Sequence, residues 1–218
     1  MDPFSPSQPE PSQPSGPLLG LLSRALEVWL RQQCSAIERL EIQLLGSAGQ
    51  LVLGRLQGVR LEARKVVYRN LRFERVDLAS GPIRVRMGAL LRGQSLQLEQ
   101  PFAVQGSVSF SGSDLAASLA TPQWRSLGDG LAEALLGFTP LAGLRIEDDR
   151  LVLRALGAGS DTPVEVVTHV EAVGGSVEVH SVDGEAHCRL PMDPAIRIER
   201  ARIGSGLLQL QGEARVSP

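Results

Sequence analysis

The segment from Phe110 to Leu127, FSGSDLAASLATPQWRSL, breaks the strand-like pattern of the chain around it. Ser111 or Ser113 can cap a helix N-terminus, because a serine hydroxyl accepts a hydrogen bond from an otherwise unpaired backbone N–H. Asp114 falls in the first turn, where the helix dipole favours negative charge. The segment therefore predicts a short helix that begins here and packs against a sheet.

A second helix is predicted directly after the first. Pro122 ends or redirects the first helix, and Trp124, Leu127, Leu131 and Leu135 follow at near-helical spacing. Two consecutive helices in a strand-rich chain favour an arrangement in which both cover one face of a sheet.

The flanking segments alternate with a period of two, which is typical of strands with one buried and one exposed face. A change of phase between Phe73 and Val76 predicts a β-bulge near Glu74. The pattern gives about ten strands and three helices, with the helices grouped. It favours an α+β fold with antiparallel strands, arranged either as two similar halves or as one long sheet folded around its helices.

The N-terminal residues form a separate region. Met1–Pro17 contains six prolines and four serines, so we expect a disordered tail over residues 1–17. From Leu18 the spacing predicts an amphipathic helix of roughly four turns, which packs on the core or also touches a membrane surface. Residues 18–218 are predicted to form a single α+β domain.

Composition limits the function classes. The chain has 218 residues, 43% hydrophobic and 21% charged, which suits one soluble globular unit, and its net charge of −2 argues against a nucleic-acid partner. No apolar run approaches the ~20 residues of a transmembrane helix. The start, MDPFSPSQPE, is acidic where a signal peptide is basic. We therefore expect a cytoplasmic protein, either free or peripheral on the inner face of a membrane.

Signatures of catalysis are missing from the sequence. It has no G-x-S-x-G, P-loop or G-x-G-x-x-G motif, so we predict no enzyme, no catalytic residue and no cofactor. His180, His187 and Cys188 are conceivable metal ligands, but their spacing matches no compact zinc pattern, and we predict no metal site. Whether Cys34 pairs with Cys188 is left open by the sequence.

One segment is strongly basic. From Arg55 to Arg92 the chain has nine arginines and one lysine against three acidic residues, a local charge of ten minus three, or +7. Arginine pairs well with phosphate because its planar fork offers several donors. The segment predicts either a solvated outer sheet face or a patch for anionic headgroups. The headgroup candidates are Arg60, Arg64, Arg72, Arg84 and Arg86.

Three features follow one another along the chain: an amphipathic N-terminal helix, a meander of alternating strands, and the step Pro101, Val104, Val108, Phe110, Asp114-Leu115, Leu119 before a helix, with SDLAASL as its most specific piece. With these features the block from Gly58 to Leu127 resembles the LmeA-type phospholipid-binding family. The resemblance implies phospholipid binding and a fold similar to tubular lipid-binding proteins, in which a long curved sheet wraps around helices and leaves an apolar groove. It implies no catalytic residues.

Two functions remain open at this point. One is a non-enzymatic phospholipid-binding protein acting at a membrane surface, with acyl chains between the sheet and the helices. The other is an assembly factor with a fully packed core and no lipid ligand, which binds a protein through its N-terminal tail or helix. The groove candidates share the apolar face near the two central helices: Val85, Leu96, Leu98, Phe102, Val104, Val108, Phe110, Leu115, Leu119, Trp124 and Leu127.

Overall fold

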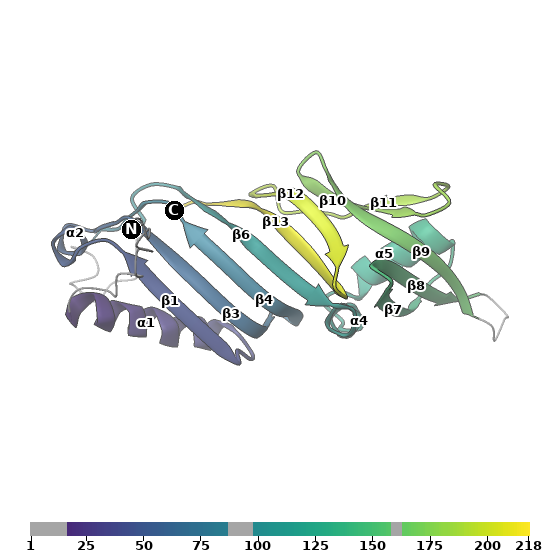
Figure 1. Ribbon diagram of the computed structural model, residues 1–218, viewed down its shortest axis with the longest axis horizontal. Helices are drawn as coiled ribbons and strands as arrows, with labels where there is room; N and C mark the ends of the chain where they lie inside the picture. Colours follow the sequence, from purple (N-terminus) through teal and green to yellow (C-terminus); the bar gives the residue numbers. More distant parts are fainter. Residues whose placement is uncertain (1–16, 87–97, 158–162) are drawn as a thin grey trace, which may run out of the picture.

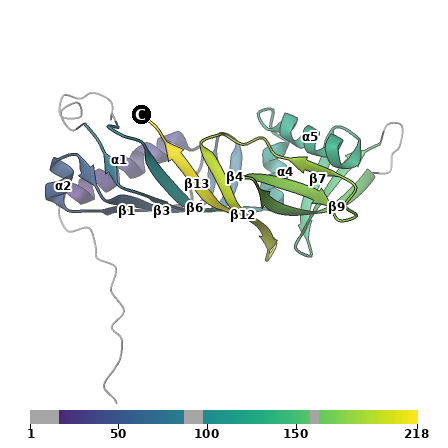
Figure 2. The ribbon, with the colours of Figure 1, turned by 90° about the horizontal axis from the view of Figure 1, so that it is seen from above.

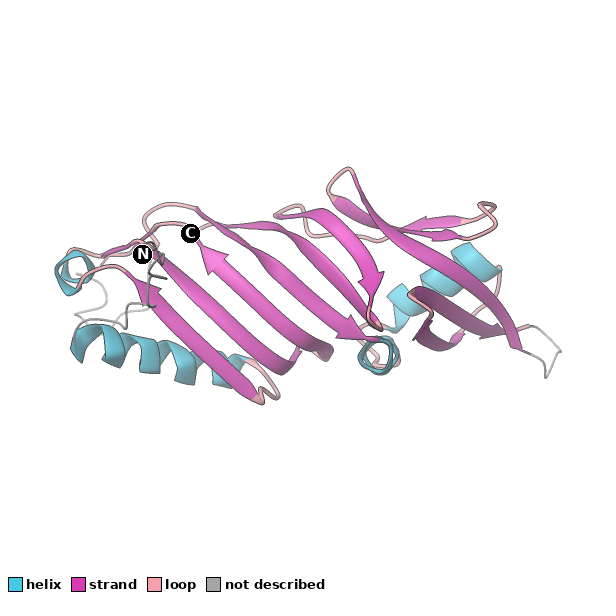
Figure 3. Ribbon diagram, in the orientation of Figure 1, coloured by secondary structure: helices cyan, strands magenta, loops and turns pink. Residues whose placement is uncertain are grey.

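Two antiparallel sheets, laid end to end along an elongated molecule, make up most of the fold (Figures 1 and 3). The structure is a computed structural model that describes residues 17–86, 98–157 and 163–218. Residues 1–16 of the expected tail and the groove candidate Leu96 lie outside the described residues.

The first sheet joins the N-terminal strands to the end of the chain. The C-terminal hairpin of the chain pairs with β6, so residues far apart in sequence are neighbours in this sheet. Its six strands, in spatial order, are β1 (Arg39–Leu45), β3 (Gly58–Tyr68), β4 (Leu71–Ser80), β6 (Phe102–Ser111), β13 (Leu207–Val216) and β12 (Ile196–Gly204).

The second sheet is built from the middle of the chain. Its five strands, in spatial order, are β11 (His187–Arg189), β10 (Ser176–Ser181), β9 (Pro163–Val173), β8 (Arg150–Leu156) and β7 (Leu141–Glu147). A small third sheet pairs β2 (Arg55–Leu56) with β5 (Ile83–Arg84). The prediction of one long sheet is therefore wrong, although the α+β class and the antiparallel pairing agree with the structure. The chain leaves the first sheet where the helix after β6 begins, and it returns only with its last two strands.

Four helices lie within the described residues: α1 (Pro17–Gln33), α2 (Ala48–Val52), α4 (Gly112–Leu119) and α5 (Arg125–Leu136). The Ser111 hydroxyl accepts from the Asp114 backbone N–H at 3.1 Å, which confirms the predicted cap of α4. Only glycine fits at position 112, because a Cβ there would lie 2.7 Å from the backbone nitrogen of Ile146 in β7. This close approach holds the start of α4 against the second sheet.

The predicted bulge near Glu74 takes a different form. Arg64 pairs with Arg75 and Val66 pairs with Phe73, so the β3–β4 register is the same on both sides of the expected irregularity. Instead, both strands change phase together at Lys65, which has φ of 50°, and at Glu74 opposite it. Lys65 and Glu74 form an ion pair there. The paired change keeps the apolar side chains on one face of the sheet along the whole strand pair.

The interior divides into a large cluster and a small one. The large cluster lies between α4, α5 and the second sheet, and it extends to the ends of β6 and β13; its buried members include Phe110, Leu119, Leu131, Leu135, Leu153, Val177, Val179 and Leu208. The small cluster lies beneath α1, and its buried members among the described residues are Ala63, Val66 and Val76. These small side chains leave space between α1 and the first sheet.

Candidate functional site

An apolar groove of about 510 Å³ lies between α1 and strands β1, β3 and β4. This volume falls in the ~300–1,000 Å³ range of small-molecule sites. No charged side chain is among the described lining residues, which are Trp29, Leu30, Gln33, Cys34, Ile37, Leu40, Leu61, Ala63, Val66, Tyr68, Phe73, Val76, Leu78 and Val108. A groove of this composition accommodates hydrocarbon and offers little to a polar substrate.

Helix α1 lies along one face of the first sheet, which Figure 2 shows edge-on, and Trp29, Leu30 and Gln33 of this helix form one wall of the groove. Leu22, Leu26 and Leu30 follow helical spacing and are half-buried, while Arg24 points to solvent. Two polar contacts fix the helix to the first strand region: Ser23 Oγ donates to the Ile42 carbonyl at 3.1 Å, and Arg31 Nη1 donates to the Ile37 carbonyl at 3.2 Å. The wall is therefore held at both ends.

The floor of the groove is a row of small and medium side chains across the sheet. Leu40 pairs with Ala63, Ala63 with Val76, and Val76 with Val108, so the four side chains share one face. Ala63 is the smallest of them and lies at the centre of the row. The space above it exists because alanine does not reach the helix.

Aromatic side chains mark the rim. Trp29 on α1 is 54% exposed, although it also lines the groove. Tyr68 is exposed at the end of β3, and the Arg69 guanidinium lies 5.4 Å from the centre of its ring. Trp and Tyr favour the boundary between apolar and aqueous phases because each has an apolar body and a polar tip. The groove thus opens to solvent beside two such rings and a cation.

Cys34 is the reactive group inside the groove. Burial raises the pKa of its thiol, so the less nucleophilic protonated form dominates near neutral pH. Burial also raises the pKa of Cys188, whose side chain packs against the large cluster. Both cysteines are free thiols.

Comparison with known protein families gives a match over residues 15–213, which spans α1, both sheets and the central helices. The chain belongs to the LmeA-like phospholipid-binding family. No curated protein and no solved structure matches it. Among the helices that the structure describes, none has the length and apolar character needed to cross a membrane.

Membership of the LmeA-like family supports a lipid-binding role. The structure does not bring the predicted groove residues together in one place. Val108 lines the groove beneath α1. Val85 and Leu98 form an isolated bridge near the small third sheet, and Val104 pairs with Ala214 away from the groove. Phe102 borders a different hollow of about 620 Å³, which is also lined by charged side chains such as Arg197 and Glu213.

The remaining groove candidates belong to the large cluster. Phe110 and Leu119 are buried in it, and three further candidates pack against it: Leu115, Trp124 and Leu127. Leu119 also borders a hollow of about 300 Å³ between α4, α5 and β7, which Arg125 and Asp129 share. Trp124 Nε1 donates to the Arg69 carbonyl at 2.8 Å and so ties the central helices to the β3–β4 turn. These five predicted residues therefore belong to the large cluster, and only Leu119 among them borders this hollow.

The arginine candidates are dispersed. Arg60 and Arg64 alternate with Leu61 and Ala63, so they lie on the face of the sheet opposite the groove. Arg72 is on that same polar face near the β3–β4 turn, since it alternates with Leu71 and Phe73. Arg84 pairs with Arg55 in the third sheet, and Arg86 is exposed just beyond it.

The polar face is partly neutralised by ion pairs. Arg75 contacts Asp77 at 2.7 Å and Glu62 at 3.5 Å, and Arg39 contacts Glu41 at 2.9 Å. Hydrogen bonding to Asp77 raises the pKa of Arg75 further above its usual range. Arg75 and Arg39 are therefore matched by carboxylates on the same face.

Sequence reasoning did not assign the α1 wall to the site. Trp29 and Leu30 on α1, and Leu61, Phe73 and Val76 on the strands, line the groove, and none of them was among the predicted groove residues. The usable signal was side-chain volume, because alanine and valine at the centre of the strand face leave room beneath a helix.

Proposed function

We propose that this protein binds phospholipid without catalysis and that it acts at a membrane surface, with the acyl chains in the groove between α1 and β1, β3 and β4. The observation that carries the proposal is the uncharged groove of about 510 Å³ in a member of a phospholipid-binding family. Burial of apolar surface supplies about 25 cal/mol per Å², so hydrocarbon that enters the groove is strongly favoured over hydrocarbon in water.

The groove mouth supports action at a membrane. Trp29 and Tyr68 are exposed there, and Val28 beside them on α1 is 53% exposed. Arg69 lies over the Tyr68 ring and adds a positive charge at the same place. In this arrangement the mouth docks on an anionic bilayer with the Trp29 and Tyr68 rings at headgroup depth and Arg69 near a phosphate. An acyl chain can then move between the bilayer and the groove without crossing water.

The test has two arms. In the first, lipid is extracted from the purified protein and the intact protein is weighed by native mass spectrometry; we expect co-purifying phospholipid, or one-to-one uptake from added phospholipid. A protein that stays lipid-free after incubation with phospholipid would contradict the proposed ligand.

The second arm tests the membrane contact by flotation with vesicles of anionic or zwitterionic phospholipid. Trp29→Ser is expected to weaken binding to anionic vesicles by about 1–3 kcal/mol, the value of burying one large apolar side chain. Leu53→Ser is the matched control, because Leu53 is 71% exposed but follows α2, at the far end of β1 from the groove. If both variants lose the same amount of vesicle binding, the groove mouth is not the membrane contact. This result would not contradict the proposal that the protein binds lipid.

A further inference from the structure

All three histidines of the chain lie in one row across the second sheet. His169 on β9 pairs with His180 on β10, and His180 pairs with His187 on β11. The ring centroids are 5.2 Å apart in the first pair and 5.6 Å apart in the second, with nearly parallel planes. The strand pairing thus gathers groups that are separated along the sequence.

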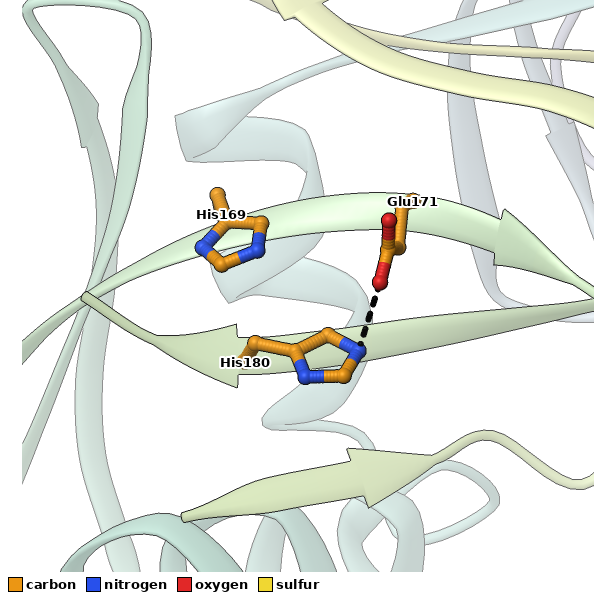
Figure 4. Close-up of side chains that lie close together, drawn as sticks. All are labelled: His169, Glu171 and His180. Carbon is orange, nitrogen blue, oxygen red and sulfur yellow. Dashed lines mark ion pairs between the residues drawn. The ribbon is translucent and has the colours of Figure 1, made fainter. Parts of the chain in front are cut away.

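The next row on the same face holds two carboxylates and Arg189, whose Nη1 lies 4.0 Å from Glu178 Oε1. Glu171 on β9 pairs with Glu178 on β10, and each is two residues from a histidine on its own strand. Glu171 Oε1 lies 3.0 Å from His180 Nε2 (Figure 4). Glu178 Oε2 lies 3.2 Å from the same nitrogen. One imidazole nitrogen therefore faces two carboxylate oxygens.

This nitrogen is buried and makes no hydrogen bond with any group in the described part of the chain. A hydrogen bond from His180 Nε2–H needs an acceptor oxygen close to the direction of the N–H bond. The oxygens of Glu171 and Glu178 are near enough in distance, but neither lies in that direction. A buried polar atom without a partner costs free energy, so the arrangement calls for a group that the two carboxylates and the ring can share.

The spacing suits a metal ion. Atoms bound to one metal at ~2.1 Å lie about 3.0 Å apart at right angles and about 3.4 Å apart at tetrahedral angles. The distances of 3.0 and 3.2 Å around His180 Nε2 match that range. One ligand atom each from His169, Glu171 and His180 also lies within 4.8 Å of the others. Glu171 is half exposed, so its side chain has room to turn toward a shared ion.

We propose that His169, Glu171 and His180 bind a divalent transition-metal ion of the zinc class, with Glu178 supplying a second carboxylate beside it. Two imidazole nitrogens and a carboxylate favour zinc and its neighbours over calcium or magnesium, which take oxygen ligands. The ion joins β9 to β10 and offsets the repulsion between the facing Glu171 and Glu178. Cys188 takes no part, because it pairs with Val179, on the core side of the sheet.

The test uses the full chain, stripped with a chelator and titrated with Zn²⁺ in competition with a chromophoric chelator. We expect one ion per chain, and we expect His180→Gln and Glu171→Gln each to weaken binding by at least about tenfold, since even outer partners of metal ligands contribute that much. His187→Gln is the matched control: it removes a histidine of the same row but no proposed ligand, so the Zn²⁺ affinity is expected to stay close to that of the wild type.

The unfolding temperature gives a second measurement, which does not depend on the variants being well folded. Zn²⁺ is expected to raise the unfolding temperature of the wild type, because an ion that binds only the folded state stabilises it. Absence of one-to-one Zn²⁺ binding by the wild type overturns the proposal. So does a folded His180→Gln variant that binds as the wild type does, or a His187→Gln variant that loses as much affinity as His180→Gln.

Discussion

A substitution that fills the groove with a larger side chain distinguishes a lipid site from an ordinary packed core, because it lowers lipid affinity in the first case and stability in the second. Ala63→Leu adds about three methylene-sized groups at the centre of the groove floor, where they occupy the space of a similar length of acyl chain. At about 0.8 kcal/mol per buried methylene, the displaced hydrocarbon is worth about 2.4 kcal/mol, which corresponds to roughly 50-fold weaker phospholipid binding.

The same substitution has a distinct expected effect on folding. Ala63 is only 3% exposed, but it lines the groove, and the groove has room for the added groups, so the free energy of unfolding of Ala63→Leu is expected to change by less than about 1 kcal/mol. Ala155 on β8 is the matched control, because it is also an alanine on a strand and its exposed fraction is 0%. Ala155→Leu forces extra volume into packed surroundings and is expected to cost about 1–3 kcal/mol of stability.

The assays are urea unfolding for stability and displacement of a phospholipid that carries a fluorescent acyl chain for affinity. Two results would refute the reasoning. One is that Ala63→Leu costs as much stability as Ala155→Leu, which would mean that the groove is closed in solution. The other is that Ala63→Leu folds normally and binds phospholipid as tightly as the wild type.

Three further results are expected. Bound phospholipid slows alkylation of Cys34 but not of Cys188, as measured by mass spectrometry of labelled peptides; equal protection of both would place the lipid elsewhere. Trp124→Phe removes the hydrogen bond to the Arg69 carbonyl, so it lowers the unfolding free energy by about 0.5–1.5 kcal/mol and leaves lipid affinity unchanged. Arg145 lowers the pKa of Glu165 by hydrogen bonding, so this pair stabilises the fold above the ordinary Glu pKa of 4.5 and the benefit is lost as the pH falls through the lower folded value. Glu165→Gln should therefore show a smaller loss of stability on acidification than the wild type does in urea titrations; an identical loss would show that the pair is not formed.

Local rules predicted the elements well. The Ser111 cap was predicted from the sequence, and the end of α5 at Gly137 and the turn at Asp148-Asp149 likewise depend on only a few neighbouring residues. Gly137 has φ of 72° and Asp148 has φ of 48°, conformations that glycine and aspartate adopt more readily than most residues. Such positions can be read from sequence because the physical cause is within a few residues of the effect.

Pairing between distant segments was out of reach. The sequence around β6 does not indicate that residues 207–216 pair with it. This pairing places the last two strands in the first sheet and not in the second. The same limit applies to the sites. Alternation identified the apolar face that holds Ala63 and Val76, but the helix above it and the space left between them depend on how the elements pack. His169, His180 and His187 meet only because three strands align in register.

The most direct test of the central claim is fluorescence quenching by phospholipid with brominated acyl chains. Trp29 lines the groove and Trp124 packs in the large cluster, so Trp124→Phe leaves Trp29 as the sole indole. The account predicts strong quenching of Trp29 by acyl bromines and weak quenching of Trp124 in the converse variant, Trp29→Phe. Quenching of Trp124 alone, or of neither tryptophan at saturating lipid, would contradict a groove beneath α1 that holds acyl chains.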